Sequence, residues 1–227
     1  MLVAFDFDGT LSDSEMTVLL GKQNGTAKDM ADITERAMND EIEYAESLRR
    51  RCELLADLPD EQARAAFDEV QLRPGAAEII AALREAGVHV AVLTGGFDRG
   101  VEAALEKEGV EVDAIVANRL PVVDGKSEAG TASEDTGGQR PQVLTGNVRG
   151  PLIEGTKDDA LEVVTAVVSE DRNDTVAVGD GANDLPMLEV AGLAIGFEPK
   201  PAVEPACDVT VSTMDELYEL LDERGVF

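Results

Sequence analysis

Acidic and hydroxyl side chains follow three short apolar runs of the sequence, and their types and spacing suggest chemistry. Asp6 and Asp8 follow the run LVAF. Because successive residues of a strand alternate between its faces, both carboxylates point to the same side. Thr94 follows a second run and precedes two glycines, and Asp180 and Asp184 follow a third. Two carboxylates at the end of a buried strand require a compensating partner.

Each of these groups has an ordinary explanation when it is taken singly. An Asp or Gly after a strand commonly makes a turn or caps a helix. In an open α/β sheet, however, ligands bind outside the carboxyl ends of the strands. Four aspartates, a hydroxyl and several glycines at three such ends therefore indicate one functional site.

Six apolar runs, rich in Val and Ile, are predicted to form the strands that position these groups. They are LVAF, VHVAVL, VDAIVA, DTVAVG, LAIGF and DVTV. Amphipathic stretches lie between them: Pro74-Gly75 opens one that closes at Gly87, and another closes at Gly109. This alternation predicts an α/β fold, a Rossmann-like doubly wound parallel sheet with helices on both faces.

Two segments interrupt the alternation. Residues 14–73 have a helical pattern throughout and are predicted to form an insertion after the first strand. Residues 124–150 are rich in Gly, Ser, Thr and acids, and a long polar loop or ragged hairpin, disordered in part, is expected there. The α/β core then comprises residues 1–13 and 74–227.

Composition excludes several classes of protein. With 47 acidic and 19 basic residues, a net charge of −28 repels nucleic acid and anionic membranes. No run approaches the roughly 18 apolar residues of a membrane span, and the N-terminus lacks a secretory signal, so a cytoplasmic location is expected. Cys52 and Cys207 lie far apart without zinc-site spacing, so neither a disulfide nor a zinc site is expected.

The acidic residues are spread along the chain, and only six of the 19 basic residues are lysine. Such a surface is similar to that of proteins from a high-salt cytoplasm, where ions screen the repulsion between like charges. We therefore expect adaptation to high salt, and an ordinary acidic cytosolic protein is the alternative.

Several other motifs can be rejected. DFDGTL lacks the third Asp or Asn and the Gly of a calcium loop. GDGAND has Asp184 where a dinucleotide site needs its third glycine, and no GxxxxGK[ST] loop exists. His89 lies at the start of its strand, away from the functional end, and is expected to be a surface or packing residue.

The remaining motifs resemble those of the haloacid dehalogenase superfamily of phosphotransferases. They are DFDGT, Thr94 in LTGG, Lys157 in GTKDDAL, and GDGAND. Further segments in matching order, including YAESLRRRCELLADLP, RPGAAEII and VANRL, are similar to the phosphoserine phosphatase family within it. The resemblance covers most of the chain. It implies Mg²⁺-dependent hydrolysis of O-phosphoserine, the last step of serine biosynthesis, and makes residues 14–73 a small helical cap domain.

The resemblance also implies roles for the acidic residues. Asp6 would be the nucleophile that forms an aspartyl-phosphate. Asp8 would act as general acid to the leaving alkoxide and as general base to the hydrolytic water. Mg²⁺ suits an all-oxygen site of Asp6, the Asp8 backbone carbonyl and Asp180, and it would offset the repulsion between a carboxylate and a phosphate dianion.

Other matched positions would bind the substrate. The phosphoryl group would be held by the following set: Thr94, Gly95, Lys157 and Asn183. Asp184 would orient metal-bound water or Lys157 from behind. In the cap, Glu15 would bind the ammonium of phosphoserine and Arg51 its carboxylate, with Tyr44 beside them.

The chain departs from the family pattern in ways that bear on the substrate. Gly9 and Thr94 stand where Ser is frequent, Tyr44 stands where Phe is usual, and the loop after Asp124 is longer. A different small phosphomonoester is therefore the first alternative, because the cap sets substrate choice. A receiver-type phospho-acceptor domain is the second, although it normally lacks a helical insertion. A purely structural role is disfavoured, and the oligomeric state stays open.

Overall fold

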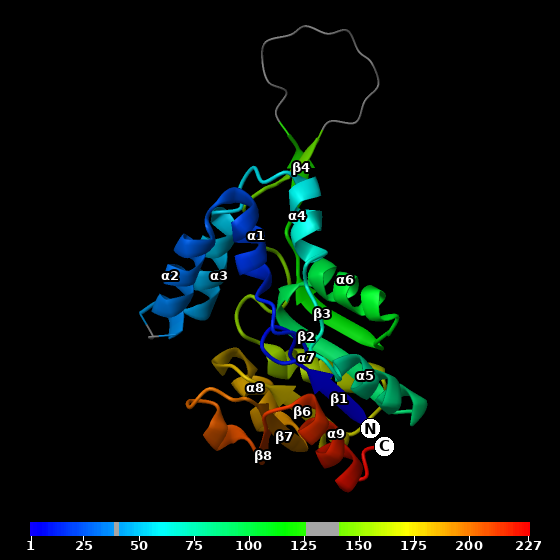
Figure 1. Cartoon of the computed structure of the whole chain (residues 1–227). Coiled ribbons are helices and arrows are strands. Elements are labelled where there is room, and N and C mark those ends of the chain that lie inside the picture. The colour runs from blue at the N-terminus through cyan, green and yellow to red at the C-terminus, as the bar shows by residue number, and fades with distance from the viewer. Residues whose placement is uncertain (39–40, 126–140) are drawn as a thin grey trace, which may run out of the picture.

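A six-stranded parallel sheet lies at the centre of the computed structural model, which describes residues 1–38, 41–125 and 141–227 (Figure 1). The strand order is β3-β2-β1-β6-β7-β8. The bounds are β1 Leu2–Phe5, β2 His89–Phe97, β3 Ala114–Asn118, β6 Thr175–Gly179, β7 Leu193–Phe197 and β8 Val209–Val211. The six predicted strands and the doubly wound α/β fold are confirmed.

The two faces of the sheet form two hydrophobic cores, because β1 is buried on both sides and its side chains alternate. Val3 and Phe5 belong to the core that includes α5, α6 and α9. Leu2 and Ala4 belong to the core that includes α7 and α8. The bounds of these helices are α5 Ala76–Glu85, α6 Asp98–Glu108, α7 Lys157–Val167, α8 Leu185–Val190 and α9 Met214–Glu223.

The helix ends follow the local sequence signals. Gly75 precedes α5 with a φ of 90°, and Gly109 closes α6 with a φ of 66°. A positive φ is costly for a residue with a Cβ, so glycine fits these positions. Thr213 precedes α9, and its hydroxyl accepts a hydrogen bond from the Glu216 backbone N–H.

Four helices lie between β1 and α5, within the segment predicted to be an insertion. They are α1 Met16–Asn24, α2 Ala27–Met38, α3 Tyr44–Glu53 and α4 Asp60–Phe67. Buried side chains of this insertion, among them Leu48, Leu55 and Phe67, belong to the same core as Val3 and Phe5. The hydrophobic core on that face of the sheet therefore continues into the insertion, which has no separate core of its own among the described residues.

A short hairpin occupies part of the segment 124–150. Strand β4 (Val122–Asp124) pairs antiparallel with β5 (Gln142–Leu144), and Val143 forms a bridge with Pro59 between α3 and α4. The hairpin thus contacts the helical insertion. The expectation of disorder falls on residues 126–140, which lie outside the described residues.

Cys52 and Cys207 are both free. The side chain of His89 is half-buried at the amino end of β2, near Asp113 and away from the carboxyl ends of the strands. Among the described helices, none is both long and apolar enough to cross a bilayer.

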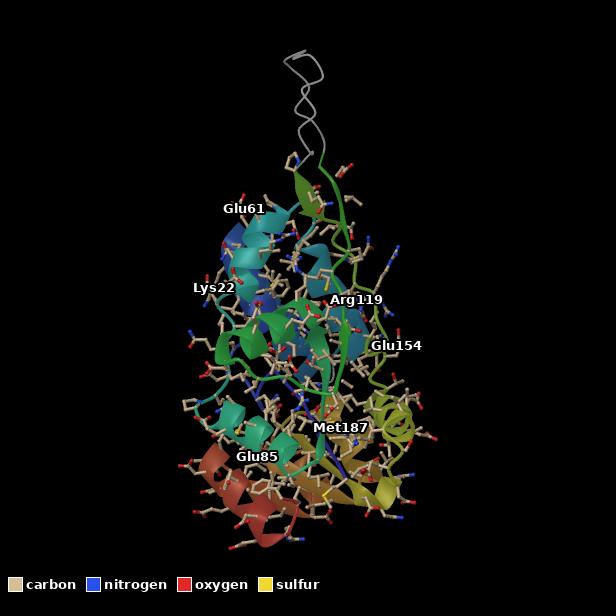
Figure 2. All side chains as sticks on the ribbon, turned by 90° about the vertical axis from the view of Figure 1, so that its right-hand side faces the viewer. Lys22, Glu61, Glu85, Arg119, Glu154 and Met187 are labelled. Atoms are coloured by element: carbon tan, nitrogen blue, oxygen red, sulfur yellow. The ribbon has the colours of Figure 1, made fainter. Side chains whose placement is uncertain are left out.

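The acidic surface leads to a prediction about salt. Exposed acids such as Glu61, Glu85 and Glu154 lie on separate parts of the molecule in Figure 2. The electrostatic repulsion between carboxylates is therefore spread over the surface. We expect the melting temperature to rise from dilute buffer to about 1 M KCl, where the Debye length falls to roughly 3 Å. Scanning calorimetry at increasing KCl measures this. A melting temperature that stays flat or falls would remove the high-salt interpretation.

Candidate active site

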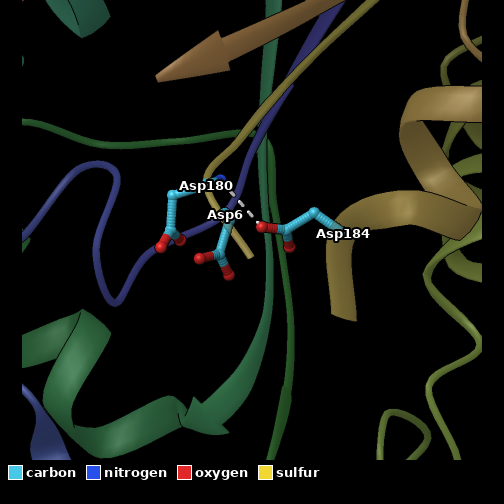
Figure 3. Close-up of side chains that lie close together, drawn as sticks. All are labelled: Asp6, Asp180 and Asp184. Atoms are coloured by element: carbon cyan, nitrogen blue, oxygen red, sulfur yellow. Dashed lines mark hydrogen bonds between the residues drawn. The ribbon is translucent and has the colours of Figure 1, made fainter. Parts of the chain in front are cut away.

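Three carboxylates converge at the carboxyl ends of β1 and β6. Asp6, Asp180 and Asp184 each offer one oxygen, and these oxygens all lie within 4.8 Å of one another. Figure 3 shows the three side chains directed toward a common space. Because β1 and β6 are adjacent parallel strands, the turns after them meet at the same edge of the sheet.

Lys157, the first residue of α7, is buried against this cluster. Its Nζ donates to Asp6 Oδ1 and to Asp184 Oδ1, each at 2.5 Å. The other oxygen of Asp184 accepts hydrogen bonds from the backbone N–H groups of Asp180 and Gly181, both at 2.9 Å. Asp184 therefore fixes the ammonium of Lys157 and the turn that carries Asp180.

The pKa values reflect an excess of negative charge. Burial, and then the neighbouring charge of Asp184, raise the pKa of Asp6 to about 8 even though Lys157 acts to lower it. Burial lowers the pKa of Lys157, but the carboxylates of Asp184 and Asp6 outweigh burial and raise it overall. Even with the Lys157 ammonium between Asp6 and Asp184 and that of Lys200 beside Asp180, three carboxylates meet two ammonium groups. The cluster therefore has the excess negative charge and the oxygen ligands that a divalent cation requires.

Asp8 lies beside this cluster with one unpaired oxygen. Its Oδ1 is buried and has no hydrogen-bond partner among the described residues. Burial, followed by the charges of Glu15 and Asp6, raises the pKa of Asp8 well above its usual value. A Cβ on Gly96 would lie 2.8 Å from Asp8 Oδ2, so only glycine permits this approach. Asp8 is thus disposed to hold a proton that it can donate.

The carboxyl-terminal residues of β2, 94–97, carry polar groups. The Gly96 N–H donates to Thr94 Oγ1 at 2.9 Å, and the register of β2 against β3 shifts between Leu93 and Phe97. The hydroxyl of Tyr44 would lie 1.9 Å from a Cβ on Gly95, so this residue of α3 packs directly on the end of β2. Burial raises the pKa of Tyr44 to about 12, which keeps its hydroxyl neutral.

A cavity of about 700 Å³ lies between the strand ends and the helical insertion. Nine of the eleven site residues predicted from the sequence line it: Asp6, Asp8, Glu15, Tyr44, Arg51, Thr94, Gly95, Asp180 and Asn183. Lys157 and Asp184 do not line the cavity. Both are buried behind Asp6. Lys157 contacts Asp6 directly, and Asp184 is connected to it through Lys157.

The insertion contributes charged groups of both signs to the cavity. Arg51 is buried, and its Nη1 donates to Thr17 Oγ1 at 3.1 Å, while its buried Nε has no partner among the described residues. Glu15 is exposed and immediately precedes α1. Arg51 and Glu15 both act on the pKa of Asp8, in opposite directions. The insertion can therefore bind a substrate that carries both a cation and an anion.

The lining residues that were not identified from the sequence include three polar ones near Asp180 and Arg51. Lys200 follows β7, and its Nζ lies 3.1 Å from Asp180 Oδ2. Thr17 accepts the hydrogen bond from Arg51, and Ser47 lies one helical turn before Arg51 with a buried Oγ that has no partner among the described residues. Lys200 follows the fifth predicted strand, so its place near the carboxyl end of a strand could have identified it from the sequence. Thr17 and Ser47 could not be identified in this way, because their positions near Arg51 in the cavity depend on how the helices of the insertion pack.

Arg49 forms an ion pair that joins the insertion to the core. Its Nη2 contacts the carboxylate of Glu154, which lies next to the cavity-lining Gly155. Arg50, by contrast, pairs with Glu46 on the same helix. Of the three consecutive arginines, Arg51 alone lines the cavity.

Known proteins are similar to this chain in sequence. Residues 3–189 match the family described as haloacid dehalogenase-like hydrolase. The chain is 50% identical over 225 residues to a phosphoserine phosphatase from Halobacterium salinarum, covering 99% of each chain. It is 38% identical to one from Methanocaldococcus jannaschii, covering 97% of this chain and 95% of the relative.

Solved structures of the same kind are also similar. A substrate-bound phosphoserine phosphatase complex superposes with a TM-score of 0.83 and 36% identity, covering 98% of this chain and 97% of the other. A phospho-aspartyl intermediate analogue of phosphoserine phosphatase gives a TM-score of 0.82 with 35% identity, covering 96% of this chain and 97% of the other.

Proposed function

Since this chain belongs to the haloacid dehalogenase-like hydrolase family, we propose that it hydrolyses O-phosphoserine to serine and phosphate through an aspartyl-phosphate on Asp6. One observation carries the proposal. Asp6 is held by Lys157 at the floor of a cavity whose opposite wall, from the helical insertion, presents Glu15 and Arg51. The similarity to phosphoserine phosphatases over nearly the whole chain supports this substrate.

Asp6 is the proposed nucleophile. Lys157 bonds to Oδ1 of Asp6, and Oδ2 accepts no hydrogen bond from the described residues, which leaves it free to attack phosphorus. The attack forms a bond between Asp6 and phosphorus and breaks the bond from phosphorus to the serine oxygen. One displacement is thereby divided into two easier ones.

Asp8 is the proposed general acid and base. Its carboxyl group, whose pKa is raised by burial, gives a proton to the departing serine oxygen. The resulting carboxylate then takes a proton from the water that attacks the aspartyl-phosphate, which regenerates Asp6 and releases phosphate. The unpaired Oδ1 of Asp8 supports this role because it keeps one oxygen free for the substrate or water.

Mg²⁺ is the proposed cofactor. Asp6 and Asp180 would bind the ion together with the backbone carbonyl of Asp8. Asp184 would keep these ligands in position through its hydrogen bonds to Lys157 and to the backbone of Asp180. The bound ion would supply positive charge that offsets the repulsion between Asp6 and the phosphate dianion. The excess of acid in the cluster supports a divalent cation there.

The phosphoryl group would be held by donors on three segments. The Thr94 hydroxyl and the Gly95 N–H lie at the end of β2, Lys157 at the start of α7, and Asn183 in the turn after β6. Thr94, Gly95 and Asn183 line the cavity, and Lys157 supplies a buried positive charge behind Asp6. Donors that are already in place stabilise the charge of the transition state without reorganisation.

Residues 14–73 would act as a cap domain that binds the serine part of the substrate. Glu15 would accept from the ammonium group, and Arg51 would donate to the carboxylate through Nε and Nη2 while Nη1 stays bonded to Thr17. Tyr44, which packs on Gly95, would separate the phosphoryl end of the cavity from solvent.

Removal of Arg51 tests the substrate assignment. Arg51→Ala should raise the KM for phosphoserine by about tenfold or more, as expected for the loss of a hydrogen bond to a charged group. Turnover of an aryl phosphate without amino and carboxylate groups should be poor in the parent and nearly unchanged in the variant. Steady-state kinetics with both substrates measure the difference.

Arg50→Ala is the matched control, because Arg50 pairs with Glu46 on the same helix and does not line the cavity. Arg49→Ala is unsuitable, since Arg49 joins the insertion to the core through Glu154. Equal losses on both substrates in Arg51→Ala would show a structural role and would remove the argument for phosphoserine.

The proposed function is tested by a phosphate-release screen over small phosphomonoesters at several salt concentrations, with Mg²⁺ and with a chelator. We expect the highest kcat/KM for phosphoserine and no turnover in chelator. A higher kcat/KM for another phosphoester would assign the enzyme to that substrate. A stable phosphorylated chain without phosphate release would indicate a phospho-acceptor domain.

A further inference from the structure

Asn118, the last residue of β3, is completely buried and uses both ends of its amide. Its Nδ2 donates to the carbonyl oxygen of Gly95 at 3.0 Å. Its Oδ1 accepts from the backbone N–H of Leu152 at 3.1 Å. Asn118 does not line the cavity, so it acts on the site only through these partners.

The bond to Gly95 reaches Thr94 through a single peptide unit. The Gly95 carbonyl and the Gly96 N–H belong to the same peptide, and in a trans peptide they point in opposite directions. Asn118 holds the carbonyl side of this peptide, and the N–H side donates to Thr94 Oγ1 at 2.9 Å. The orientation of the peptide plane therefore fixes the hydrogen bond that the Thr94 hydroxyl receives.

This bond determines what the Thr94 hydroxyl can do. A hydroxyl has one hydrogen to donate and two lone pairs to accept with. Because the Gly96 N–H occupies one lone pair, the hydrogen of Thr94 remains available for an acceptor in the cavity that Thr94 lines. Glycines at 95 and 96 give this peptide little intrinsic rigidity, so it needs an external bond to hold its orientation.

The second bond of Asn118 joins the end of β2 to the segment that leads to Lys157. Arg119 and Arg149 exchange two backbone hydrogen bonds of 2.7 and 3.0 Å. A Cβ on Gly150 would lie 2.3 Å from Asn118 Oδ1, so the segment passes in direct contact with Asn118. Asn118 thus connects β2, β3 and the chain that enters α7.

We propose that Asn118 is a positioning residue for phosphoryl transfer, which orients the Thr94 hydroxyl through the Gly95–Gly96 peptide. The inference rests on the proposed function, because it gives Thr94 a phosphoryl oxygen to bind. It goes further in assigning a role to a residue that touches neither the substrate nor the proposed metal ligands. The serine part of the substrate is held by the insertion, so the loss of Asn118 should affect kcat more than KM.

A double-mutant cycle with Thr94 tests this. Asn118→Asp keeps the acceptor for Leu152 and replaces the donor to Gly95, and Asn118→Leu removes both bonds at similar volume. Each should lower kcat for phosphoserine by about tenfold with KM changed less than about threefold, and Thr94→Val should lower kcat by about 10²-fold. In the Thr94→Val background, either Asn118 substitution should lower kcat by less than about a further threefold. The effects of residues that act through one another are not additive.

The affinity for inorganic phosphate provides a readout that does not depend on phosphoserine. Calorimetric titration with Mg²⁺ present should show phosphate binding weakened about threefold by Asn118→Asp when Thr94 is intact, in keeping with the small expected change in KM, and unchanged in the Thr94→Val background. If the parent binds phosphate but does not hydrolyse phosphoserine, the substrate assignment fails, and the phosphate titrations still judge Asn118.

Two control variants separate positioning from general destabilisation. Asn147→Asp makes the same chemical change at an exposed position, and Leu217→Ala removes buried volume in α9 away from the site. Neither should change kcat, although Leu217→Ala should lower the melting temperature. Parental kcat and phosphate affinity in both Asn118 variants would overturn the proposal. Losses that multiply with those of Thr94→Val would also overturn it, since Asn118 would then act independently of Thr94.

Discussion

Asp6→Asn is expected to remove turnover of phosphoserine, with kcat reduced by roughly 10⁴-fold or more, the scale seen when a catalytic nucleophile is lost. The amide has nearly the shape of the carboxylate but is a poor nucleophile. The fold should persist, because Lys157 keeps its bond to Asp184. Phosphate release and the melting temperature are measured together. Turnover near the parental rate would exclude Asp6 as the nucleophile.

Two other acids serve as controls for Asp6. Asp13→Asn makes the same change on an exposed residue of the following loop and should leave kcat unchanged. Asp8→Asn keeps the nucleophile but removes proton transfer, so it should slow both steps by about 10²- to 10⁴-fold. The order of the three activities, Asp13→Asn above Asp8→Asn above Asp6→Asn, separates the nucleophile from the acid.

Lys157→Met is expected to have the second largest effect, on both activity and stability. Without the ammonium, Asp6 and Asp184 face each other unpaired in a buried site, and breaking a buried pair in this way costs about 3–5 kcal/mol of unfolding free energy. The loss of the buried positive charge behind Asp6 should lower kcat by about 10²- to 10³-fold. Kinetics at saturating Mg²⁺ and thermal unfolding in chelator measure the two effects.

The stability loss in Lys157→Met should depend on pH with a defined sign. In the folded parent the pKa of Asp6 is already raised above its unfolded value, and removing the ammonium raises it further. The folded state then binds more protons than the unfolded state, so stability falls as the pH rises above about 4, the ordinary range of an aspartate. Lys22→Met, which removes an exposed lysine on α1, should change neither quantity. A pH-independent difference would contradict the account of the buried cluster.

Much of the fold and site could be predicted because their causes are local. Buried parallel strands are short apolar runs, and glycines such as Gly109 mark helix ends through their backbone conformation. The candidate site could be located because the carboxyl ends of β1, β2 and β6 meet at one edge of the sheet whatever the details of packing. Asp6, Thr94 and Asp180 therefore follow from the order of strands and turns alone.

The remaining features depend on tertiary packing. The contact of Tyr44 with Gly95 and the bond from Arg51 to Thr17 require the insertion to lie against the core at a particular angle. The pair of Arg49 with Glu154 joins residues 105 positions apart. Likewise, VANRL was noticed only as a matching segment, because the two partners of the Asn118 amide lie on distant parts of the chain.

The central claim is that phosphate passes through a covalent bond to Asp6. Its most direct test is to mix the chain with Mg²⁺ and phosphoserine, stop the reaction in acid during turnover, and analyse the N-terminal peptide by mass spectrometry. We predict the mass of one phosphoryl group on this peptide, located at Asp6 by fragmentation and absent from Asp6→Asn. The same analysis is made with Asp8→Asn, in which hydrolysis of the intermediate is slowed. Steady turnover by that variant without a phosphorylated peptide would contradict the account. So would a phosphoryl group on a residue other than Asp6.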